Sequence, residues 1–480
     1  MKACNGRRSN YAILFFVIVV LVATTILPTY REFSAVSTVA LKEQTSIVTN
    51  SSISTDDKRK KEHNNDFYYD RERWSSAKIA VLVGPHKTAS STLQGFLVGL
   101  TAQEISVHDN DTNSTYKYPN DEWVWPVGIK SEYSDEFNGI NAVKFYAALG
   151  SCLFGRHTDH FFPKWKHQTK EEIQEARVWI LEYFRSLFAR VWNDGMNLVI
   201  GSEHFDTLVM SLAKNDNRTS HYNGEETHVA PDSSNKIAHF LDLLPWSSNA
   251  NLNASSRNLR LEDIEIQINF RTPRINHEVS IWHQLGEGET LKDFMVNKTE
   301  LMFYLNSLAL ALQFVRKGIK TTIIDMQGVK EKESNKNSTT ISSKNSTEET
   351  IIIGGLQGVV ACDILRMGND REGTDVFCDD NSTLHISNYD VPVRDLNKRK
   401  DKAERELSDK QMEDINRVYE EYDCSVWKHL KKYQEKGLLR ILYPSEHLFE
   451  TCDPSSPDIS FYDTTLRART IASRNKDWAQ

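Results

Sequence analysis

The sequence predicts an α/β fold with three layers, in which a parallel sheet is flanked by helices. Short apolar runs indicate buried strands, longer segments carry apolar residues at helical spacing, and the two kinds alternate along the chain. The chain has 480 residues, of which 39% are hydrophobic. It can therefore bury a core large enough for such a fold.

The predicted elements begin with a strand that starts at Ile79. In chain order the others are helix 171–192, strand 197–200, helix 234–244, strand 264–270, helices 278–285 and 301–315, strands 320–325 and 351–354, a long helix after 408, and strand 438–443. Ser408 is a typical N-cap and Gly437 a typical helix end, so local signals bound the long helix.

The N-terminal part of the chain predicts a membrane anchor. Residues 11–27 are an unbroken apolar run behind a basic segment, which predicts a type II signal anchor with residues 1–10 in the cytoplasm. A cleaved signal peptide is the competing interpretation. The polar segment 28–74 predicts a disordered stem. We expect a lumenal domain over 75–455 with a flexible insertion at 328–350, followed by a C-terminal tail at 456–480.

Sequons and cysteines indicate the lumen of the secretory pathway. Nine N-x-[ST] sequons follow the apolar run, and such sequons are glycan acceptors in secreted or lumenal proteins. Five cysteines also follow it. From closeness in sequence we expect Cys362 to pair with Cys378 and Cys424 with Cys452, while the fifth stays free or pairs between chains. The net charge of −8 excludes a global basic field for nucleic acid.

The segment 79–97, IAVLVGPHKTASSTLQGFL, predicts a strand, a loop and a helix that together bind a phosphate. Backbone N–H groups and the helix dipole favour an anion at the helix start, Lys87 adds a charge, and Ser90 and Ser91 add donors. In nucleotide hydrolases the lysine follows a long glycine loop, whereas here the lysine comes first. The alternative is an ordinary helix start rich in serine and threonine.

Two motifs resemble those of the PAPS-dependent sulfotransferases of the Golgi type, where PAPS is 3′-phosphoadenosine 5′-phosphosulfate. The first resembles their 5′-phosphosulfate loop, although Ala89 stands where the family usually has glycine. The residues that would contact PAPS there are His86, Lys87, Thr88, Ala89, Ser90, Ser91 and Thr92. The second motif, RTPRINHEVSIWHQL after strand 264–270, resembles the 3′-phosphate site. Arg271 and Ser280 would clamp the phosphate and Arg274 would be a second donor, but the serine comes one residue later than usual.

The resemblance covers roughly residues 78–452 and implies a P-loop-like sulfotransferase fold in the Golgi membrane. It implies transfer of a sulfuryl group from PAPS to an acceptor hydroxyl without a metal, with a glycan as the favoured acceptor and a tyrosine or small metabolite as alternatives. Lys87 would neutralise the leaving oxygen. Glu203 or His204, which follow strand 197–200, would be the base. Glu203 is preferred because it comes first, but the choice stays open.

Two other classes of protein share some of these features. A Golgi type II glycosyltransferase would carry the same anchor and glycans, but it usually needs a D-x-D metal site. Asp109-Asn110-Asp111 and Asp379-Asp380 fit that site poorly because they lie in polar loops beside sequons. A catalytically inactive lumenal scaffold with the same fold is the third class, and the intact lysine motif argues against it.

Overall fold

The structure is a computed structural model. It describes residues 77–84, 93–97, 102–104, 123–127, 146, 148–150, 152–153, 168–202, 205, 234–246, 258–285, 288–304, 306–335, 350–367, 376–379, 382–387, 406–445, 448–450 and 452–474. The predicted cytoplasmic tail, signal anchor and stem lie outside these residues. In the described ranges no helix is both long enough and apolar enough to cross a bilayer.

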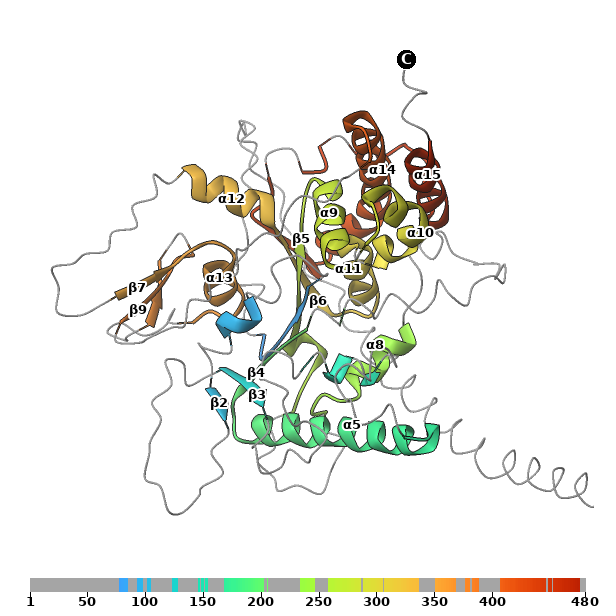
Figure 1. The fold of residues 1–480 in the computed structure, drawn as a ribbon. Coiled ribbons are helices and arrows are strands. Elements are labelled where there is room, and N and C mark those ends of the chain that lie inside the picture. Colours follow the sequence, from blue (N-terminus) through green and yellow to red (C-terminus); the bar gives the residue numbers. More distant parts are fainter. Residues whose placement is uncertain are drawn as a thin grey trace, which may run out of the picture. The chain divides into compact units, whose positions relative to one another are not determined.

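Seven parallel strands form the main sheet (Figure 1). Their order is β2–β3–β4–β1–β5–β6–β10, and every neighbouring pair is parallel. The strands are β1 (Ile79–Val83), β2 (Ala102–Glu104), β3 (Trp123–Val127), β4 (Asn197–Ser202), β5 (Ile264–Phe270), β6 (Lys320–Asp325) and β10 (Leu439–Leu442). The prediction of an α/β fold with a parallel sheet flanked by helices is confirmed.

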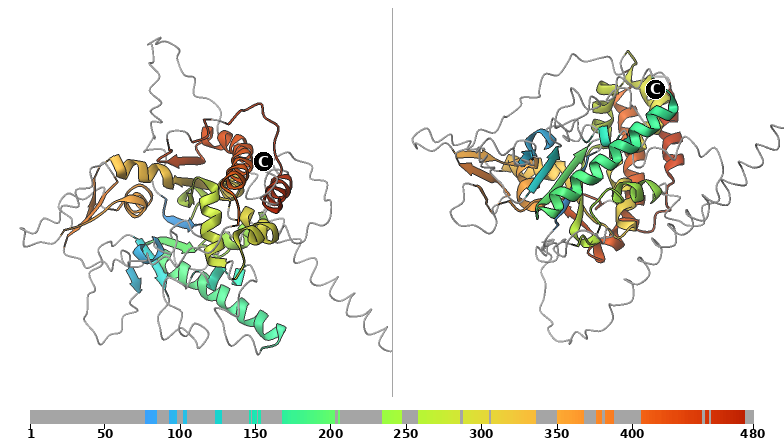
Figure 2. Two further views of the ribbon diagram at one scale, coloured as in Figure 1. Left: turned by 45° about the horizontal axis from the view of Figure 1, so that its top comes forward. Right: turned by 90° about the horizontal axis from the view of Figure 1, so that it is seen from below.

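Helices cover the sheet. They are α5 (Lys170–Asn193), α8 (Ser234–Leu241), α9 (Arg274–Leu285), α10 (Leu291–Tyr304), α11 (Ser307–Arg316), α12 (Met326–Asn335), α14 (Asp409–Glu435) and α15 (Phe461–Ser473). Helix α5 packs on β3 and β4, whereas α11 packs on β5 and β6. Figure 2 shows α9, α11 and α14 gathered near one another, and α14 contacts both of the others.

Local sequence signals explain where the long helices begin and end. Thr169 caps α5 in a capping box with Glu172, and Ser408 caps α14 in a capping box with Gln411. These pairs satisfy N–H groups that a helix start leaves without a partner. Gly437 follows α14 with φ +70°, a backbone conformation that favours glycine. The predicted cap and end of α14 are therefore confirmed.

A small antiparallel sheet is inserted between β6 and α14. Its order is β7 (Thr350–Ile353), β9 (Leu384–Ser387) and β8 (Val376–Cys378). Helix α13 (Gly355–Val359) and a π-helical turn, Val360–Ile364, follow β7. The strand expected at 351–354 is thus present, but it pairs within this small sheet. Strand–helix alternation predicts parallel pairing in one sheet, so it did not predict this antiparallel pairing of β7 with β9.

Both expected disulfides are present. Cys362 in the π-helical turn bonds Cys378 of β8, and Cys424 of α14 bonds Cys452. Cys152 is buried as a free thiol. Burial raises the pKa of that thiol to about 12, against a smaller opposing effect of Arg177. Two disulfides are typical of a protein that folds in an oxidising compartment.

Three helical segments between β5 and β7 differ from the sequence-based expectation. Residues 301–315, expected as one helix, belong to two, because Asn306 caps α11 by accepting a hydrogen bond from the Ala309 N–H at 2.7 Å. Residues 328–335, expected in a flexible insertion, are helical in α12, and residues 336–349 lie outside the described residues. Helix α9 begins at Arg274 rather than at 278.

The segment 456–480, expected as a tail, contains α15, which packs on α10 and α14. Ser460 caps this helix by accepting from the Asp463 N–H at 3.1 Å. Its buried face is made of Thr464, Thr465, Ala468 and Ala472. Small residues at helical spacing give a weak hydrophobic signal, which is why the sequence pattern did not reveal the helix.

We predict that Gly328→Ala destabilises the protein by about 3 kcal/mol. A Cβ added to Gly328 of α12 would lie 1.9 Å from the carbonyl oxygen of Tyr443, which is backbone that cannot swing aside. The control is Gly95→Ala, because a Cβ there meets no atom within 4 Å and residues 93–97 are helical. Urea unfolding followed by circular dichroism measures both changes. Equal stability of the two variants would contradict this close packing.

Candidate functional site

The loops that carry the predicted site follow three neighbouring strands. β1 lies between β4 and β5, and Val83 is in register with Ser202 at the carboxyl ends of β1 and β4. After β1 the chain crosses to β2 at one edge, whereas after β5 it continues to β6 on the other side. Strands whose connections leave in opposite directions form a topological switch point, where ligands of open parallel sheets bind.

The second predicted motif is assembled at this switch point. Arg271, directly after β5, donates a hydrogen bond from Nη1 to Ser280 Oγ of α9 at 2.9 Å. The Ser280 hydroxyl donates in turn to the carbonyl oxygen of Asn276 at 2.9 Å. Both side chains are half-buried. The additional residue in the motif therefore does not separate Arg271 from Ser280. Helix α9 begins at Arg274, and its helical turns place Ser280 within hydrogen-bond distance of Arg271.

Arg274, expected as a second phosphate donor, is placed differently. Its side chain is 2% exposed and lies among side chains of α9 and α14. Nη2 is 3.6 Å from Glu278 Oε1, Nε is 3.8 Å from Asp423 Oδ2, and the guanidinium lies 6.0 Å from the centre of the Tyr419 ring. In this structure Arg274 faces two buried acids. We call Arg274, Glu278 and Asp423 the α9 cluster.

The α9 cluster is linked to the end of β5 through α11. Asn306, the N-cap of α11, donates from Nδ2 to Asp423 Oδ1 at 2.6 Å. The next residue, Ser307, donates to the backbone carbonyl of Asn269 at 2.7 Å, two residues before Arg271. One carboxylate on α14 thus contacts both the guanidinium that starts α9 and the cap that fixes the strand end.

Burial sets the protonation of the acids in the α9 cluster. Burial raises the pKa of Glu278 to about 8, with Arg274 acting in the opposite direction and Asp423 in the same direction. Burial also raises the pKa of Asp423, while Arg274 and the hydrogen bond from Asn306 lower it. Neither oxygen of Glu278 accepts a hydrogen bond within the described part of the chain. Glu278 is therefore the acid that holds a proton near neutral pH.

Sequence reasoning did not single out Glu278 or Asp423, although Asp423 left a signal. It lies four residues after Tyr419, between the buried residues Tyr422 and Val426 of the long helix. A charged residue within such a stripe indicates a buried partner, since a lone buried charge is costly. Glu278 lies four residues after Arg274 on one helix face, a spacing that brings opposite charges together.

The remaining predicted site residues lie outside the described residues. These are His86, Lys87, Thr88, Ala89, Ser90, Ser91 and Thr92 of the lysine loop, and Glu203 and His204 after β4. The segments that flank them are described. Val83 ends a fully buried strand, and helical residues 93–97 place Leu93 and Leu97 in the core. The strand and the helix predicted on either side of the loop are confirmed.

A second group of buried charges joins the small sheet to the main sheet. Arg440 of β10 donates to Glu265 Oε1 of β5 and to Thr322 Oγ1 of β6, both at 2.5 Å. It also donates to the backbone carbonyl of Asp363 in the π-helical turn at 3.2 Å. Burial raises the pKa of Glu265 to about 7, with the Thr322 hydrogen bond opposing it, and burial lowers the pKa of Arg440 to about 9. We call Glu265, Thr322 and Arg440 the β5 cluster.

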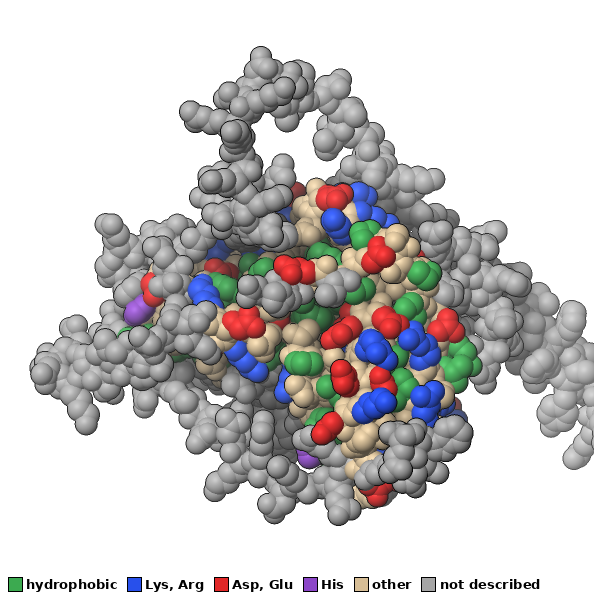
Figure 3. All heavy atoms as spheres, turned by 90° about the horizontal axis from the view of Figure 1, so that it is seen from above, with side chains coloured by type: hydrophobic (Ala, Val, Ile, Leu, Met, Phe, Trp, Pro, Cys, Tyr) green, Lys and Arg blue, Asp and Glu red, His purple; other side chains and the backbone are tan. Residues whose placement is uncertain are grey.

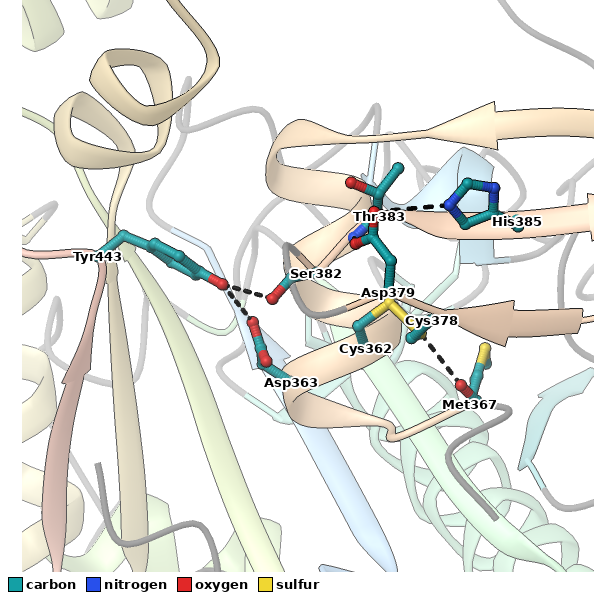
Figure 4. The surroundings of a disulfide bond; sticks show 9 residues. All are labelled: Cys362, Asp363, Met367, Cys378, Asp379, Ser382, Thr383, His385 and Tyr443. Atoms are coloured by element: carbon teal, nitrogen blue, oxygen red, sulfur yellow. Dashed lines mark hydrogen bonds and ion pairs between the residues drawn. A yellow bond between two sulfur atoms is a disulfide. The ribbon is translucent and has the colours of Figure 1, made fainter. Parts of the chain in front are cut away.

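Tyr443 completes this junction after β10. Figure 4 shows its hydroxyl pointing toward Asp363 and Ser382 beside the Cys362–Cys378 disulfide. Tyr443 Oη lies 2.7 Å from Asp363 Oδ2 and 2.5 Å from Ser382 Oγ. These contacts attach two parts of the small sheet region to one residue of the main fold, so the small sheet is anchored by side-chain hydrogen bonds as well as by the disulfide.

Asp379, one of the acids considered for a D-x-D metal site, forms other contacts in the structure. Asp379 accepts the Thr383 N–H at 2.8 Å and lies 3.6 Å from His385 Nε2, so it holds the turn between β8 and β9. In the described ranges no three His, Cys, Asp or Glu side chains gather as metal ligands. Residues 109–111 and 380 lie outside those ranges.

The surface offers both signs of charge. On the face shown in Figure 3, acidic and basic side chains interleave among the described residues. Helix α14, for example, exposes Asp409 and Glu413 beside Lys410 and Arg417. An anionic ligand would therefore be bound by local donors rather than by a broad positive surface.

Comparisons with known proteins give no relative. No family model matches the chain, and neither the curated proteins nor the solved structures contain a match. What the protein does is therefore inferred from its own residues and contacts.

We predict that Glu278→Gln changes how stability depends on pH. In the folded protein Glu278 keeps its proton to about pH 8, whereas in the unfolded chain it ionises near 4.5. The stability contribution of the protonated form is complete below pH 4.5 and is lost as pH rises through about 8. Glutamine stays neutral, so the variant should be more stable than the original protein above about pH 8 and similar below about pH 5.

Urea midpoints measured from about pH 5 to pH 9 test this expectation. The control is Glu413→Gln, since Glu413 is exposed on α14 and its replacement should leave the pH profile unchanged. A Glu278→Gln profile parallel to that of the original protein would show that Glu278 is ionised in the folded state.

Proposed function

We propose that this protein is a sulfotransferase that uses PAPS to sulfate a hydroxyl group, with a glycan as the favoured acceptor. The observation that carries the proposal is the contact between Arg271 and Ser280 at the end of β5, beside the strand that leads into the lysine loop. An arginine fork next to a hydroxyl is a donor set that suits a phosphate group. The two phosphate-binding motifs thus follow adjacent strands, as one nucleotide with phosphates at both ends requires.

The proposed reaction is an in-line transfer. Glu203 or His204 takes the proton from the acceptor hydroxyl, whose oxygen forms a bond to sulfur. The bond between sulfur and the bridging oxygen of the 5′-phosphate breaks, and its electron pair stays on that oxygen. Lys87 stabilises the charge that develops there, and 3′-phosphoadenosine 5′-phosphate leaves. Arg271 and Ser280 hold the 3′-phosphate and thereby fix the distance between the nucleotide and the acceptor.

The proposed location is the Golgi membrane, with the catalytic domain in the lumen. The apolar run 11–27 with its basic flank supports a type II anchor. The two disulfides and nine sequons support a lumenal domain. PAPS would be the co-substrate, and the chemistry requires no metal.

We predict that Arg271→Ala weakens binding of 3′-phosphoadenosine 5′-phosphate by about one to two orders of magnitude, because a charge-assisted hydrogen bond to the 3′-phosphate is lost. Binding of adenosine 5′-phosphate, which lacks that group, should change little. Isothermal titration calorimetry measures both affinities. Arg417→Ala removes an exposed arginine of α14 and serves as the control.

Equal losses for the two nucleotides would mean that Arg271 does not contact the 3′-phosphate. If the original protein binds both nucleotides equally, the assignment of this site to a bisphosphorylated nucleotide is wrong.

The activity itself is tested by transfer of radiolabelled sulfate from PAPS to glycan and peptide acceptors. We expect label on a glycan, and Glu203→Gln should lower turnover by about two to four orders of magnitude with nucleotide affinity nearly unchanged. His204→Ala should then have a much smaller effect. Adjacent residues of an extended strand point to opposite faces, so only one of the two faces the acceptor if the strand continues through them.

A strong loss in His204→Ala alone would transfer the role of base to the histidine. Absence of transfer to every acceptor by the original protein, with nucleotide binding intact, would favour an inactive scaffold with the same fold.

A further inference from the structure

The α9 cluster buries more ionisable side chains than the stability of the fold requires. Arg274, Glu278 and Asp423 are 2%, 0% and 4% exposed, so three ionisable side chains are removed from water at one place. Apolar side chains of similar volume would fill that space at a lower desolvation cost. Nε and Nη1 of Arg274 form no hydrogen bond within the described residues, so charge rather than close hydrogen bonding holds the guanidinium.

The position of the cluster relates it to the phosphate clamp, which we define as Arg271 and Ser280. The two clamp residues come from different elements, because Arg271 follows β5 and Ser280 belongs to α9. Their contact at 2.9 Å requires α9 to keep a fixed position and rotation relative to the end of β5. Arg274 is the first residue of α9, so whatever holds Arg274 also holds that end of the helix.

Asp423 contacts both Arg274, which begins α9, and Asn306, which caps α11. On one side its Oδ2 lies 3.8 Å from Arg274 Nε. On the other side its Oδ1 accepts from Asn306, and the adjacent Ser307 donates to the carbonyl of Asn269 at the end of β5. A single carboxylate on α14 thus connects the start of α9 to the strand end that carries Arg271.

We propose that Asp423 is a positioning residue for the phosphate clamp: by holding Arg274 and the α11 cap together, it keeps Arg271 and Ser280 directed at one phosphate. The inference rests on the proposed function, because it assigns the clamp to the 3′-phosphate of a nucleotide. It predicts that the charge of Asp423 affects the selectivity for that phosphate.

The two acids of the cluster have different roles in this inference. Burial raises the pKa of Asp423, while Arg274 and the hydrogen bond from Asn306 oppose that rise and favour the ionised carboxylate. Glu278 accepts none in the described ranges, and its raised pKa of about 8 leaves it neutral at pH 7. Replacing Glu278 by glutamine at pH 7 therefore preserves the charge of that side chain, whereas Asp423→Asn replaces the carboxylate oxygen that faces Arg274.

The experiment compares Asp423→Asn with two matched controls at pH 7. Glu278→Gln is the neutral replacement within the same cluster. Glu265→Gln removes another buried acid, which belongs to the β5 cluster and contacts Arg440 and Thr322 rather than α9. Calorimetry gives the affinity ratio between 3′-phosphoadenosine 5′-phosphate and adenosine 5′-phosphate. We expect the ratio to fall about tenfold in Asp423→Asn and to stay within about twofold in both controls.

Asp423→Glu, which restores the charge, should recover most of the ratio. If Asp423→Asn does not fold, the double variant Arg274→Gln with Asp423→Asn replaces it, because a neutral pair leaves no unpaired buried charge. The ratio should fall in that variant as well.

An unchanged ratio in a folded Asp423→Asn or double variant would overturn the inference. So would a similar fall in Glu278→Gln or Glu265→Gln, because it would show that loss of any buried acid disturbs the clamp. Equal binding of the two nucleotides by the original protein would instead contradict the proposed function, and the two failures are therefore distinguishable.

Discussion

The parallel pairing of β1 with β5 is the constraint on which the rest of the structure depends. The lysine motif follows β1 and the arginine motif follows β5, and these strands are far apart in sequence. Parallel pairing brings their carboxyl ends to the same edge of the sheet. The connections after the two strands leave in opposite directions, which makes this edge a topological switch point. Without this pairing, the two motifs could not share the nucleotide that we propose as their ligand.

The two buried groups of charged residues hold different parts of the fold together. The β5 cluster joins three neighbouring strands and, through Arg440 and Tyr443, attaches the small sheet. The α9 cluster joins three helices around the end of one strand. Both use a buried arginine, but Arg440 forms several hydrogen bonds whereas Arg274 is held at longer range by two acids. For this reason we assign a structural role to the β5 cluster, and we propose that the α9 cluster positions Arg271 and Ser280.

Much of the architecture could be predicted from local sequence. β5 and β6 have the predicted bounds, α5 and α14 lie within one or two residues of them, and both disulfides join the expected cysteines. The misses share a physical cause. Helix α15 buries small residues, the break between α10 and α11 depends on the cap Asn306, and β7 pairs with β9 in a separate antiparallel sheet. In each case packing or one side-chain contact, rather than hydrophobic periodicity, decided the outcome.

The sequence by itself determined the strands β1, β4, β5, β6 and β10 and most of the helices. It also determined the order of the two motifs and the candidate residues Arg271 and Ser280, because all of these depend on periodicity, caps and residue chemistry within short segments. Only the tertiary structure decided that Arg271 reaches Ser280 despite the additional residue, and that Arg274 faces Glu278 and Asp423. It also decided that Asp423 contacts Asn306, the cap of α11. These contacts join segments up to 149 residues apart in the chain, from Arg274 to Asp423 (423 minus 274). Such distances are set by the packing of helices on the sheet, which no local pattern encodes.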